Sequence, residues 1–447
     1  MGKLFGTDGI RGRANEEPMS AETMMKVGAA AGRYFMRGDH QHKVILGKDT
    51  RLSGYMIEQA LSAGFMSVGM DVTLLGPLPT PGVAIQTREG SADLGVMISA
   101  SHNPYQDNGI KLFGPDGRKL SDEAERVIES WVAGKSAPTS EVQQKTIGRL
   151  TRDICAQERY QNFVMSVRSN VANFTGLRVV IDCANGAGYK VATGALRGLG
   201  AEVVPLHADP DGTNINDQCG STFPSAMCRA VLDNQAHIGF ALDGDADRVV
   251  AADEQGELLD GDQLMAALAT EMQSKGQLIG NGVVATQMSN LGLERYLKGL
   301  GLHLVRTRVG DRYVTEQMFE NGYNLGGEQS GHIILSDHNA TGDGLVTVVK
   351  ILSMLCEKGK PASEVCRMFK PLPQKLTNIP CSSEEVLEEY ELDSLISECE
   401  NELAGVGRLL VRYSGTEAAV RIMVEAEEES VVHAITKKLA GAVAKCV

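Results

Sequence analysis

The chain has 447 residues, of which 43% are hydrophobic and 22% are charged. This composition is close to ordinary globular usage and excludes a disordered chain, and at about 150 residues per domain the length predicts two to four domains. With 43 basic and 57 acidic residues the net charge is −14. An acidic chain is poorly suited to nonspecific binding of nucleic acid or anionic membranes, so we expect neither as a partner.

The cysteines and the apolar segments bear on where the protein resides. No stretch approaches the roughly 18 apolar residues that a membrane span requires, and the N-terminus has no apolar signal core. The nine cysteines are odd in number and form no C-x-x-C pair. Such usage is typical of reduced thiols, so we expect a cytoplasmic protein.

Three stretches share one layout, an apolar strand followed by a glycine-containing turn and a helix. They begin at Lys43, Leu177 and Gly282. Each precedes a second apolar strand that leads into an unusual loop, within the segments 95–104, 238–248 and 323–332. Strands that alternate with helices in this way predict three related α/β domains with mixed or parallel sheets. Ligand loops of such sheets lie at the carboxyl ends of the strands, where these three loops fall.

The last part of the chain has a different pattern. It follows a segment with two prolines, 370–374, and opens with a capping box at Ser382 and Glu385 that predicts a helix to about Leu403. Two strands, from Gly407 and Ala419, and a helix over about 430–444 come next. We therefore predict a small α+β domain at 370–447, after α/β domains at 1–150, 151–253 and 254–369, with a polar linker at 134–148.

The segment LDGDADR, residues 242–248, predicts a metal site. Asp243, Asp245 and Asp247 place three carboxylates at alternate positions of a turn. Oxygen ligands of this kind suit Mg²⁺ or Ca²⁺. A calcium EF-hand loop is one alternative, but it requires glycine at the position held by Arg248, and the flanking residues have the pattern of strands. A solvated surface turn is the other alternative.

The segment SASHNPYQDNGIKLF, residues 99–113, contains a candidate nucleophile. Small neighbours leave Ser101 exposed at the end of a strand. A serine hydroxyl needs a base, a metal or prior phosphorylation to carry a group, and His102 and Lys111 are the nearby candidates for proton transfer. An ordinary Ser/Asn turn is the alternative, and the absence of a G-x-S-x-G elbow argues against an α/β-hydrolase.

The segment RYSGTEAAVR, residues 412–421, supplies the basic pocket that an anionic ligand would need in an acidic protein. Arg412 and Arg421 bracket a turn in which Ser414, Gly415 and Thr416 offer hydroxyl and backbone N–H donors. This combination suits a phosphate dianion, whereas no Walker A lysine is present for a nucleoside triphosphate. A plain hairpin with two surface arginines is the alternative.

Two further segments contain polar groups on a glycine-rich backbone. GEQSGH, residues 327–332, combines Glu328, Ser330 and His332, a mixture suited to a polyhydroxylated ligand. GTDGIRG, residues 6–12, adds Arg11 and is a weak signal by itself.

In their order along the chain, these five segments resemble those of the α-D-phosphohexomutases. The resemblance covers essentially the whole chain, and VGDRYV (309–314) and GEQSGH are most similar to the branch that acts on glucosamine phosphates. Relatives that act on glucose or mannose phosphates more often carry Met in place of Gln329 and Gly-His in place of Gly310-Asp311. One departure is Ala418, where the family usually has proline; its loss costs about 0.4–1 kcal/mol of loop preorganisation.

The resemblance implies four domains around a central cleft and an active form phosphorylated on Ser101. It implies one Mg²⁺ on Asp243, Asp245 and Asp247 together with a phosphate oxygen on Ser101. The residues that it assigns to substrate or to proton handling are Arg11, Lys111, Arg248, Glu328, Ser330, His332, Arg412, Ser414, Gly415, Thr416 and Arg421. We expect Lys111 to act as the base ahead of His332, with a pKa lowered by Arg11 and the metal.

The implied reaction interconverts glucosamine 6-phosphate and glucosamine 1-phosphate through a bisphosphate, a step that feeds UDP-N-acetylglucosamine synthesis. A hexose or glucosamine 1,6-bisphosphate is the expected activator, and a homodimer is possible. A phosphoglucomutase or phosphomannomutase is the nearest alternative. A noncatalytic sugar-phosphate sensor is a third hypothesis, but a sensor does not need a phosphoryl carrier.

Overall fold

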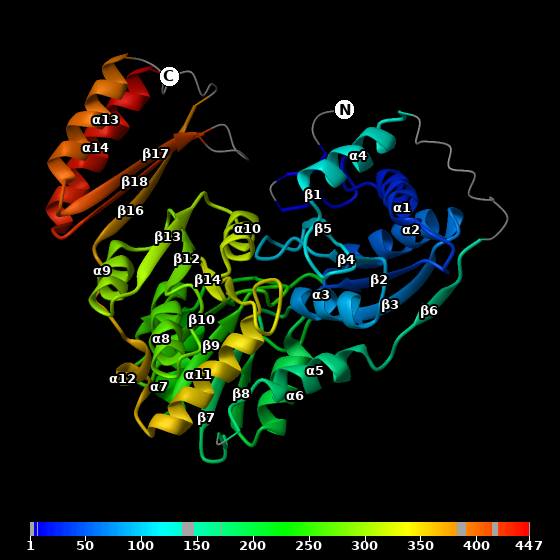
Figure 1. The fold of residues 1–447 in the computed structure, drawn as a ribbon, viewed down its shortest axis with the longest axis horizontal. Coiled ribbons are helices and arrows are strands. Elements are labelled where there is room, and N and C mark those ends of the chain that lie inside the picture. The colour runs from blue at the N-terminus through cyan, green and yellow to red at the C-terminus, as the bar shows by residue number, and fades with distance from the viewer. Residues whose placement is uncertain are drawn as a thin grey trace.

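The structure, a computed structural model, describes residues 4–6, 8–135, 147–170, 172–381, 390–413 and 419–446. Within these residues the strands form four sheets, which Figure 1 shows in colour order along the chain. Among the described residues, no helix is both long and apolar enough to cross a bilayer. The eight cysteines whose side chains are described are free thiols.

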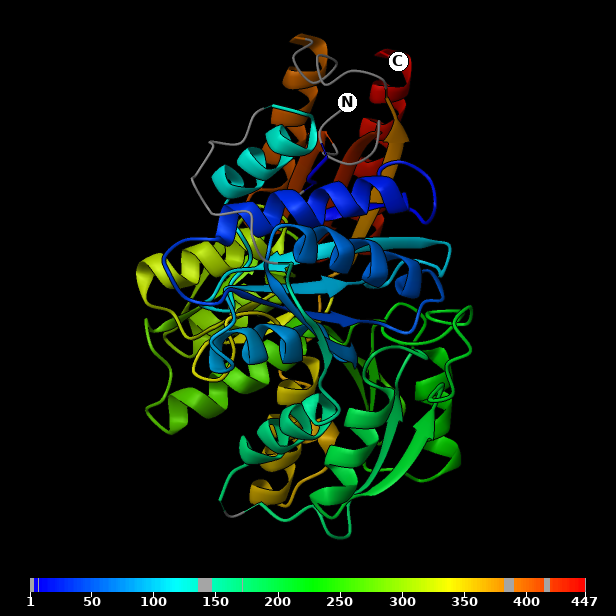
Figure 2. The ribbon, with the colours of Figure 1, turned by 90° about the vertical axis from the view of Figure 1, so that its right-hand side faces the viewer.

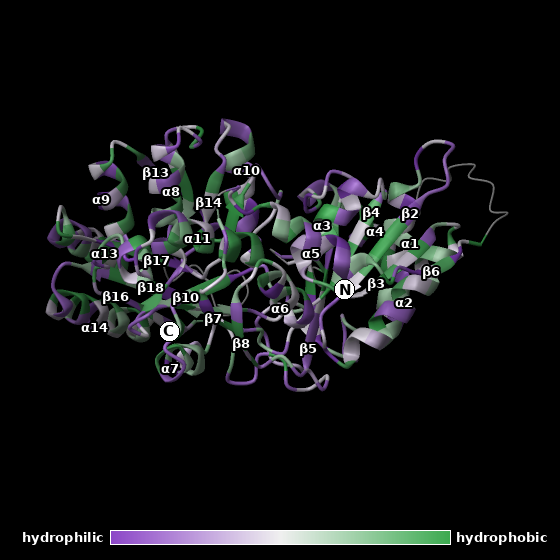
Figure 3. Ribbon diagram, turned by 90° about the horizontal axis from the view of Figure 1, so that it is seen from below, coloured by the Kyte–Doolittle hydropathy of each residue, from purple (hydrophilic) through white to green (hydrophobic). Residues whose placement is uncertain are grey.

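The first sheet has six strands in the order β1-β5-β4-β2-β3-β6. Their bounds are β1 Ile10–Arg13, β2 Lys43–Lys48, β3 Asp71–Pro77, β4 Leu94–Ile98, β5 Asp107–Phe113 and β6 Leu150–Arg152. The helices of this part are α1 Ala21–Phe35, α2 Ser53–Ser67, α3 Thr80–Glu89 and α4 Asp122–Val132. In Figure 3 the central strands β2 and β4 are hydrophobic along most of their length, as expected of strands covered on both faces.

The second and third sheets have the orders β11-β10-β9-β7-β8 and β13-β12-β14-β15. The strands are β7 Arg178–Asp182, β8 Glu202–Leu206, β9 Ile238–Leu242, β10 Val249–Asp253, β11 Leu258–Leu259, β12 Gly282–Thr286, β13 His303–Thr307, β14 Leu325–Gly327 and β15 Ile333–Leu335. The helices are α5 Ala156–Ser166, α6 Tyr189–Gly198, α7 Ser225–Asp233, α8 Gly261–Ser274, α9 Leu291–Gly299, α10 Asp311–Asn321, α11 Gly344–Lys358 and α12 Ala362–Cys366.

The three sheets repeat one arrangement. In each, a central strand (β2, β7 or β12) pairs in parallel with a strand on either side, and an antiparallel strand follows on one edge. The prediction of three related α/β domains with mixed sheets is therefore confirmed. The strand β11 pairs with β10 of the second sheet although it follows residue 253. The four domain boundaries themselves stay predictions.

The C-terminal part is a separate antiparallel sheet with the order β16-β18-β17. Its strands are β16 Gln374–Pro380, β17 Gly407–Tyr413 and β18 Ala419–Ala426, and its helices are α13 Tyr390–Leu403 and α14 Glu429–Cys446. Figures 1 and 2 show the two helices side by side on this sheet. The small α+β domain is thus confirmed, whereas the capping box at Ser382 and Glu385 lies outside the described residues.

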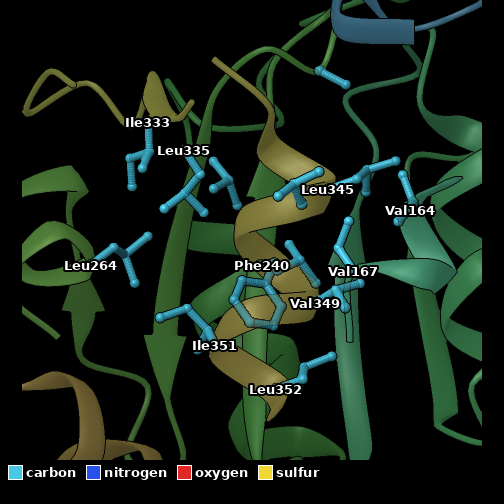
Figure 4. Close-up of a cluster of buried hydrophobic side chains, with 14 of the residues drawn as sticks. Val164, Val167, Phe240, Leu264, Ile333, Leu335, Leu345, Val349, Ile351 and Leu352 are labelled. Atoms are coloured by element: carbon cyan, nitrogen blue, oxygen red, sulfur yellow. The ribbon is translucent and has the colours of Figure 1, made fainter. Parts of the chain in front are cut away.

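One hydrophobic core joins the first three sheets. It includes Ile45 of the first sheet, Phe240 of the second and Val283 of the third. Figure 4 shows Phe240 of β9 against α11, with apolar side chains of α5, α8 and β15 around them. The C-terminal sheet has its own core, with Val420, Ile422 and Val424 of β18. The loops at the ends of the first three sheets therefore rest on one shared packed core.

Candidate active site

The three unusual loops follow equivalent strands of the repeat, β4, β9 and β14, and the structure brings them together. Ser101 is buried, whereas we expected it to be exposed, and its Oγ donates a hydrogen bond to Asp243 Oδ2 at 2.6 Å. Lys111 Nζ donates to Asp245 and Asp247 at 2.8 and 2.9 Å. Residues from separate sheets thus form a single site.

The backbone of the Ser101 loop is fixed in an uncommon conformation. Ser101 has a φ of +52° in the left-handed region, which a non-glycine residue keeps only where its surroundings impose it. Its backbone N–H donates to Ser99 Oγ at 2.9 Å, and Asn216 Nδ2 donates to its carbonyl at 2.8 Å. The loop therefore presents the Ser101 hydroxyl from a preorganised backbone.

Arg51 is a buried support of this loop, and no sequence pattern singled it out. Its guanidinium is fully buried, forms an ion pair with Asp49 at 2.8 Å and donates to the carbonyl of Ser101 at 2.9 Å. It also donates to the carbonyls of Asn103, Pro104 and Asp107. The only sequence signal was the turn KDTRLSG after β2, which we interpreted solely as part of the repeat.

The three aspartates fit a divalent cation. The oxygens of Asp243, Asp245 and Asp247 lie within 4.8 Å of one another, and all three side chains are buried. The Oδ1 atoms of Asp245 and Asp247 are buried without a hydrogen-bond partner. Burial and the two neighbouring carboxylates raise the pKa of Asp243 well above its ordinary value. Converging buried acceptors with unused lone pairs are what an oxygen-binding metal ion requires.

The EF-hand alternative for this segment is wrong. The aspartates lie in the turn between β9 and β10, which pair as antiparallel strands, whereas an EF-hand loop lies between two helices. The surface-turn alternative is also wrong, because the three carboxylates are buried.

Lys111 lies between carboxylates, which determines its charge. Burial by itself lowers the pKa of Lys111, but the carboxylates of Asp245, Asp247 and Asp8 raise it well above the ordinary value. The lowered pKa that we expected is therefore not found among the protein groups. The charge of Arg11 lowers the pKa of Lys111, but the carboxylates outweigh it.

His102 and Arg248 are further neighbours of Ser101. His102 Nδ1 is 3.4 Å from Ser101 Oγ and 3.3 Å from Arg248 Nη1. Burial, with the charges of Arg248 and Arg11, lowers the pKa of His102 to about 4. His102 is therefore a neutral ring at physiological pH.

Three charged residues that the sequence did not single out extend the site. Lys119 Nζ donates to the carboxylates of both Asp8 and Asp311. Lys111 Nζ is 3.6 Å from Asp8, and His332 Nε2 is 3.6 Å from Asp311. Asp8 and Asp311 stood in two of the motifs that carry the resemblance, but Lys119 had no signal. These charges alternate in sign and link the first sheet to α10.

His332 is held from both sides of its ring. Nδ1 is 3.6 Å from Asp247, and the Gly342 backbone N–H donates to Nε2 at 3.1 Å. Burial lowers the pKa of His332, but Asp247 and Asp311 outweigh burial and raise it. Because Nε2 accepts a hydrogen bond, this geometry places the proton of the neutral ring on Nδ1.

Glu328 and Ser330 lie in the tight turn before His332. The backbone N–H of Glu328 donates to the carbonyl of His332 at 3.0 Å, and Gly331 donates back to Glu328 at 2.9 Å. Ser330 is exposed and Glu328 half-buried, and the negative charge of Glu328 acts on Arg248. Both side chains are thus available to a ligand at the edge of the site.

The two C-terminal arginines face each other across a strand pair. Arg412 of β17 is directly opposite Arg421 of β18, so their side chains lie on one face of the sheet. Burial, and then the charge of Arg421, lower the pKa of Arg412. Two positive charges at this distance favour the binding of an anion between them. Ser414, Gly415 and Thr416 lie outside the described residues.

Comparison with known families covers nearly all of the chain. Four family models match, namely the phosphoglucomutase/phosphomannomutase alpha/beta/alpha domains I, II and III over residues 2–138, 158–256 and 260–372, and the C-terminal domain over 375–442. The chain belongs to the phosphoglucomutase/phosphomannomutase family. The resemblance noted in the sequence is confirmed.

Within this family, the chain is similar to curated proteins named phosphoglucosamine mutase. The chain is 56% identical to the phosphoglucosamine mutase of Granulibacter bethesdensis, over 99% of this chain and 96% of the relative. It is 57% identical to the phosphoglucosamine mutase of Zymomonas mobilis, over 97% of each chain.

Solved structures of family members share the fold. A phosphoglucomutase/phosphomannomutase family protein from Burkholderia thailandensis superposes with a TM-score of 0.81 at 22% identity, over 99% of this chain and 97% of that chain. The N-acetylphosphoglucosamine mutase of Aspergillus fumigatus, in complex with GlcNAc-6P and magnesium, gives 0.67 at 20% identity, over 99% and 96%. At these identities the likeness bears on the fold alone.

Proposed function

We propose that this family member is a phosphoglucosamine mutase, which interconverts glucosamine 6-phosphate and glucosamine 1-phosphate. The observation that carries the proposal is the buried contact of Ser101 Oγ with Asp243, at 2.6 Å, within a cluster of three carboxylates. A hydroxyl held against a metal-binding cluster suits a phosphoryl carrier. The relatives that are 54–57% identical over nearly their whole length support the choice of glucosamine phosphates as substrates.

Asp243, Asp245 and Asp247 would hold Mg²⁺, together with an oxygen of phosphorylated Ser101. When bound, the ion supplies positive charge that stabilises the phosphoryl group during transfer. The protein residues fix the distance and direction of transfer, because Asn216 and Arg51 hold the Ser101 carbonyl and thereby its backbone. Mg²⁺ and the 1,6-bisphosphate activator are parts of this proposal.

In the first half-reaction the bond between phosphorus and Ser101 Oγ breaks, and a bond forms to O1 of glucosamine 6-phosphate. The hydroxyl at O1 loses a proton, and Ser101 Oγ gains one. Its raised pKa keeps Lys111 an ammonium that carries a proton, and we propose it as the proton donor. His332 is the proposed acceptor, at Nε2, once the hydrogen bond that Nε2 accepts from Gly342 N–H breaks. This reverses our expectation for Lys111. In the second half the bisphosphate returns its 6-phosphate to Ser101, and the two groups exchange roles.

The remaining proposed site residues bind substrate. Arg412 and Arg421, with Ser414, Gly415 and Thr416, would hold the phosphate that does not react. Glu328, Ser330 and Arg248 would hold sugar hydroxyls in either orientation of the ring. Arg11 and His102 would complete the site around the transferred group, Arg11 by charge and His102 as a neutral hydrogen-bonding ring.

The test is a coupled assay on glucosamine 6-phosphate with Mg²⁺ and a catalytic amount of hexose bisphosphate. The proposal predicts turnover of glucosamine 6-phosphate with a higher kcat/KM than glucose 6-phosphate or mannose 6-phosphate. A preference for glucose or mannose phosphate would favour the phosphoglucomutase or phosphomannomutase alternative. Binding without turnover of any of the three would favour the sensor. The homodimer, checked by sedimentation, and the cytoplasmic location remain predictions.

A further inference from the structure

A second cluster of metal-binding side chains lies in the second sheet. Asp182 ends β7, His207 directly follows β8 and Cys219 lies in the loop before α7. One ligand atom from each, a carboxylate oxygen, a ring nitrogen and a sulfur, lies within 4.8 Å of the other two. The proposed reaction uses none of these three residues.

The histidine and the aspartate form a close pair, at a distance typical of an ion pair. His207 Nδ1 is 3.0 Å from Asp182 Oδ2, yet this nitrogen is buried and has no hydrogen-bond partner in the described structure. The Asp182 carboxylate raises the pKa of His207, so a metal would take this nitrogen by displacing the proton that it shares with Asp182. The Cys219 side chain is fully buried, so the sulfur is confined beside the other two donors.

Backbone groups fix the direction of the carboxylate. The N–H of Ala184 donates to Asp182 Oδ1 at 2.9 Å, and the N–H of Gly220 donates to Oδ2 at 3.0 Å. Each carboxylate oxygen retains a further lone pair. Metal-binding carboxylates are commonly oriented by hydrogen bonds of this kind.

We propose that Asp182, His207 and Cys219 bind a zinc ion, with water in the fourth position. A set of one oxygen, one nitrogen and one sulfur suits zinc, which takes all three ligand types in tetrahedral geometry, and does not suit magnesium. Binding releases the thiol proton to solvent as the sulfur–metal bond forms, and no oxidant or reductant is needed. The side chain of His207 is 33% exposed, which gives the ion and the proton a path to solvent.

The cluster lies where an ion would connect a loop of the second domain to two strands. The loop that carries Cys219 also supplies Asn216, whose amide donates to the carbonyl of Ser101 at 2.8 Å. The next residues contact the strand that precedes the aspartates, where Ser221 N–H donates to the carbonyl of Leu242 at 2.9 Å. Zinc at this point would tie this loop to β7 and β8 directly behind the active site.

The experiment titrates the full, chelator-treated protein with Co²⁺, an ion of zinc-like preferences whose bond to a thiolate gives an intense near-ultraviolet charge-transfer band. We expect this band to saturate at one Co²⁺ per chain and to disappear when Zn²⁺ is added. Oxygen-only binding at the three aspartates of the active site gives no such band, and neither does the sulfur-free cluster of His40, His42 and Asp93.

Variants assign the band to its ligands. Cys219→Ser should abolish it, and His207→Gln should weaken Co²⁺ binding by at least about tenfold. Cys155→Ser, at an exposed cysteine, and Asp245→Asn should leave the band unchanged. If Cys219→Ser does not fold, the partly exposed His207→Gln decides the question. The absence of a band in the wild type, or its persistence in Cys219→Ser or at full affinity in His207→Gln, would overturn the proposal and leave a His207–Asp182 pair only.

Discussion

The Ser101 loop and the arginine pair of the C-terminal sheet serve the same proposed substrate but are built differently. The carbonyl of Ser101 accepts hydrogen bonds from Arg51 and Asn216, which come from two different sheets' loops. Arg412 and Arg421 are fixed by their own hairpin, β17 and β18. At the opposite end of this hairpin, Arg408 and Glu425 form hydrogen bonds with the third domain.

The difference separates two tasks. A transferred phosphoryl group tolerates little misplacement, and long-range contacts supply the required rigidity around Ser101. A phosphate that is only held needs charge and donors, which one hairpin can provide. We therefore expect substitutions in the first region to abolish transfer or stability, and substitutions in the second to weaken substrate binding.

The largest expected effect is that of Ser101→Ala. Without the carrier hydroxyl, mutase activity should fall by at least about 10⁴-fold, because the covalent route is lost. Intact-mass analysis of active wild-type enzyme should show an adduct of about 80 Da at Ser101, one phosphoryl group, which the variant lacks. Ser166→Ala, on the exposed face of α5, is the control and should retain full activity. Wild-type turnover by Ser101→Ala would refute the phosphoenzyme.

Next is the stability contributed by Arg51. Arg51→Met leaves the Asp49 carboxylate buried and without its ion-pair partner, so the free energy of unfolding should fall by about 3–5 kcal/mol. Urea unfolding measures this loss. The matched control is Arg13→Met, which removes an exposed pair with Glu16 at 3.4 Å and should cost less than about 1 kcal/mol. Equal losses in the two variants would contradict the special role of the buried support.

Asp245→Asn removes one negative charge from the metal cluster with little change in volume. Activity should fall by about 10²-fold or more and recover poorly with added Mg²⁺, because ligand charge provides much of the affinity for a hard ion. Chelation of the wild type should have a similar effect. Asp233→Asn, at an exposed helix end, is the control. If neither chelator nor Asp245→Asn changes the rate, the aspartates hold no catalytic ion.

Arg421→Ala tests the second region. A charge-assisted bond to phosphate is worth about 1.5–3 kcal/mol, so KM for both glucosamine phosphates should rise by about 10- to 150-fold. Phosphorylation of Ser101 should be unaffected, since Arg421 belongs to a sheet with a separate core. The control is Lys375→Ala, at an exposed residue of β16, which should leave KM unchanged. Arg408→Ala is unsuitable because Arg408 contacts the third domain. An unchanged KM in both directions would remove Arg421 from the phosphate site.

The smallest expected effect concerns pH. The pKa of His102 is about 4 in the folded protein and about 6.5 in an unfolded chain. Between these values the unfolded chain binds the additional proton, so His102 makes the protein less stable as pH falls from about 6.5 towards 4. Between pH 7 and pH 5 the loss should be about 2 kcal/mol, and His102→Gln should remove it. An identical pH dependence of urea unfolding in both proteins would contradict the low pKa.

The local features of this protein follow from short stretches of its sequence. Alternating strands and helices determined three α/β repeats and a different C-terminal domain, because the hydrophobic period is a local property. The spacing of Asp243, Asp245 and Asp247 determined a carboxylate turn, since ligands two residues apart meet without help from distant segments. The ordered motifs determined the family. The roles of the individual site residues remain predictions.

Tertiary structure alone decided the environment of those residues. Lys111 pairs with Asp245 across 134 positions of the chain, and Lys119 pairs with Asp311 across 192. No local pattern encodes such pairs, and they reversed the expected direction of the Lys111 pKa. Arg51 became a central support in the same way, through carbonyl groups about 50 residues away. The charge states and the rigidity of the site residues depend on which loops lie next to one another. The packing of three sheets on one core brings those loops together.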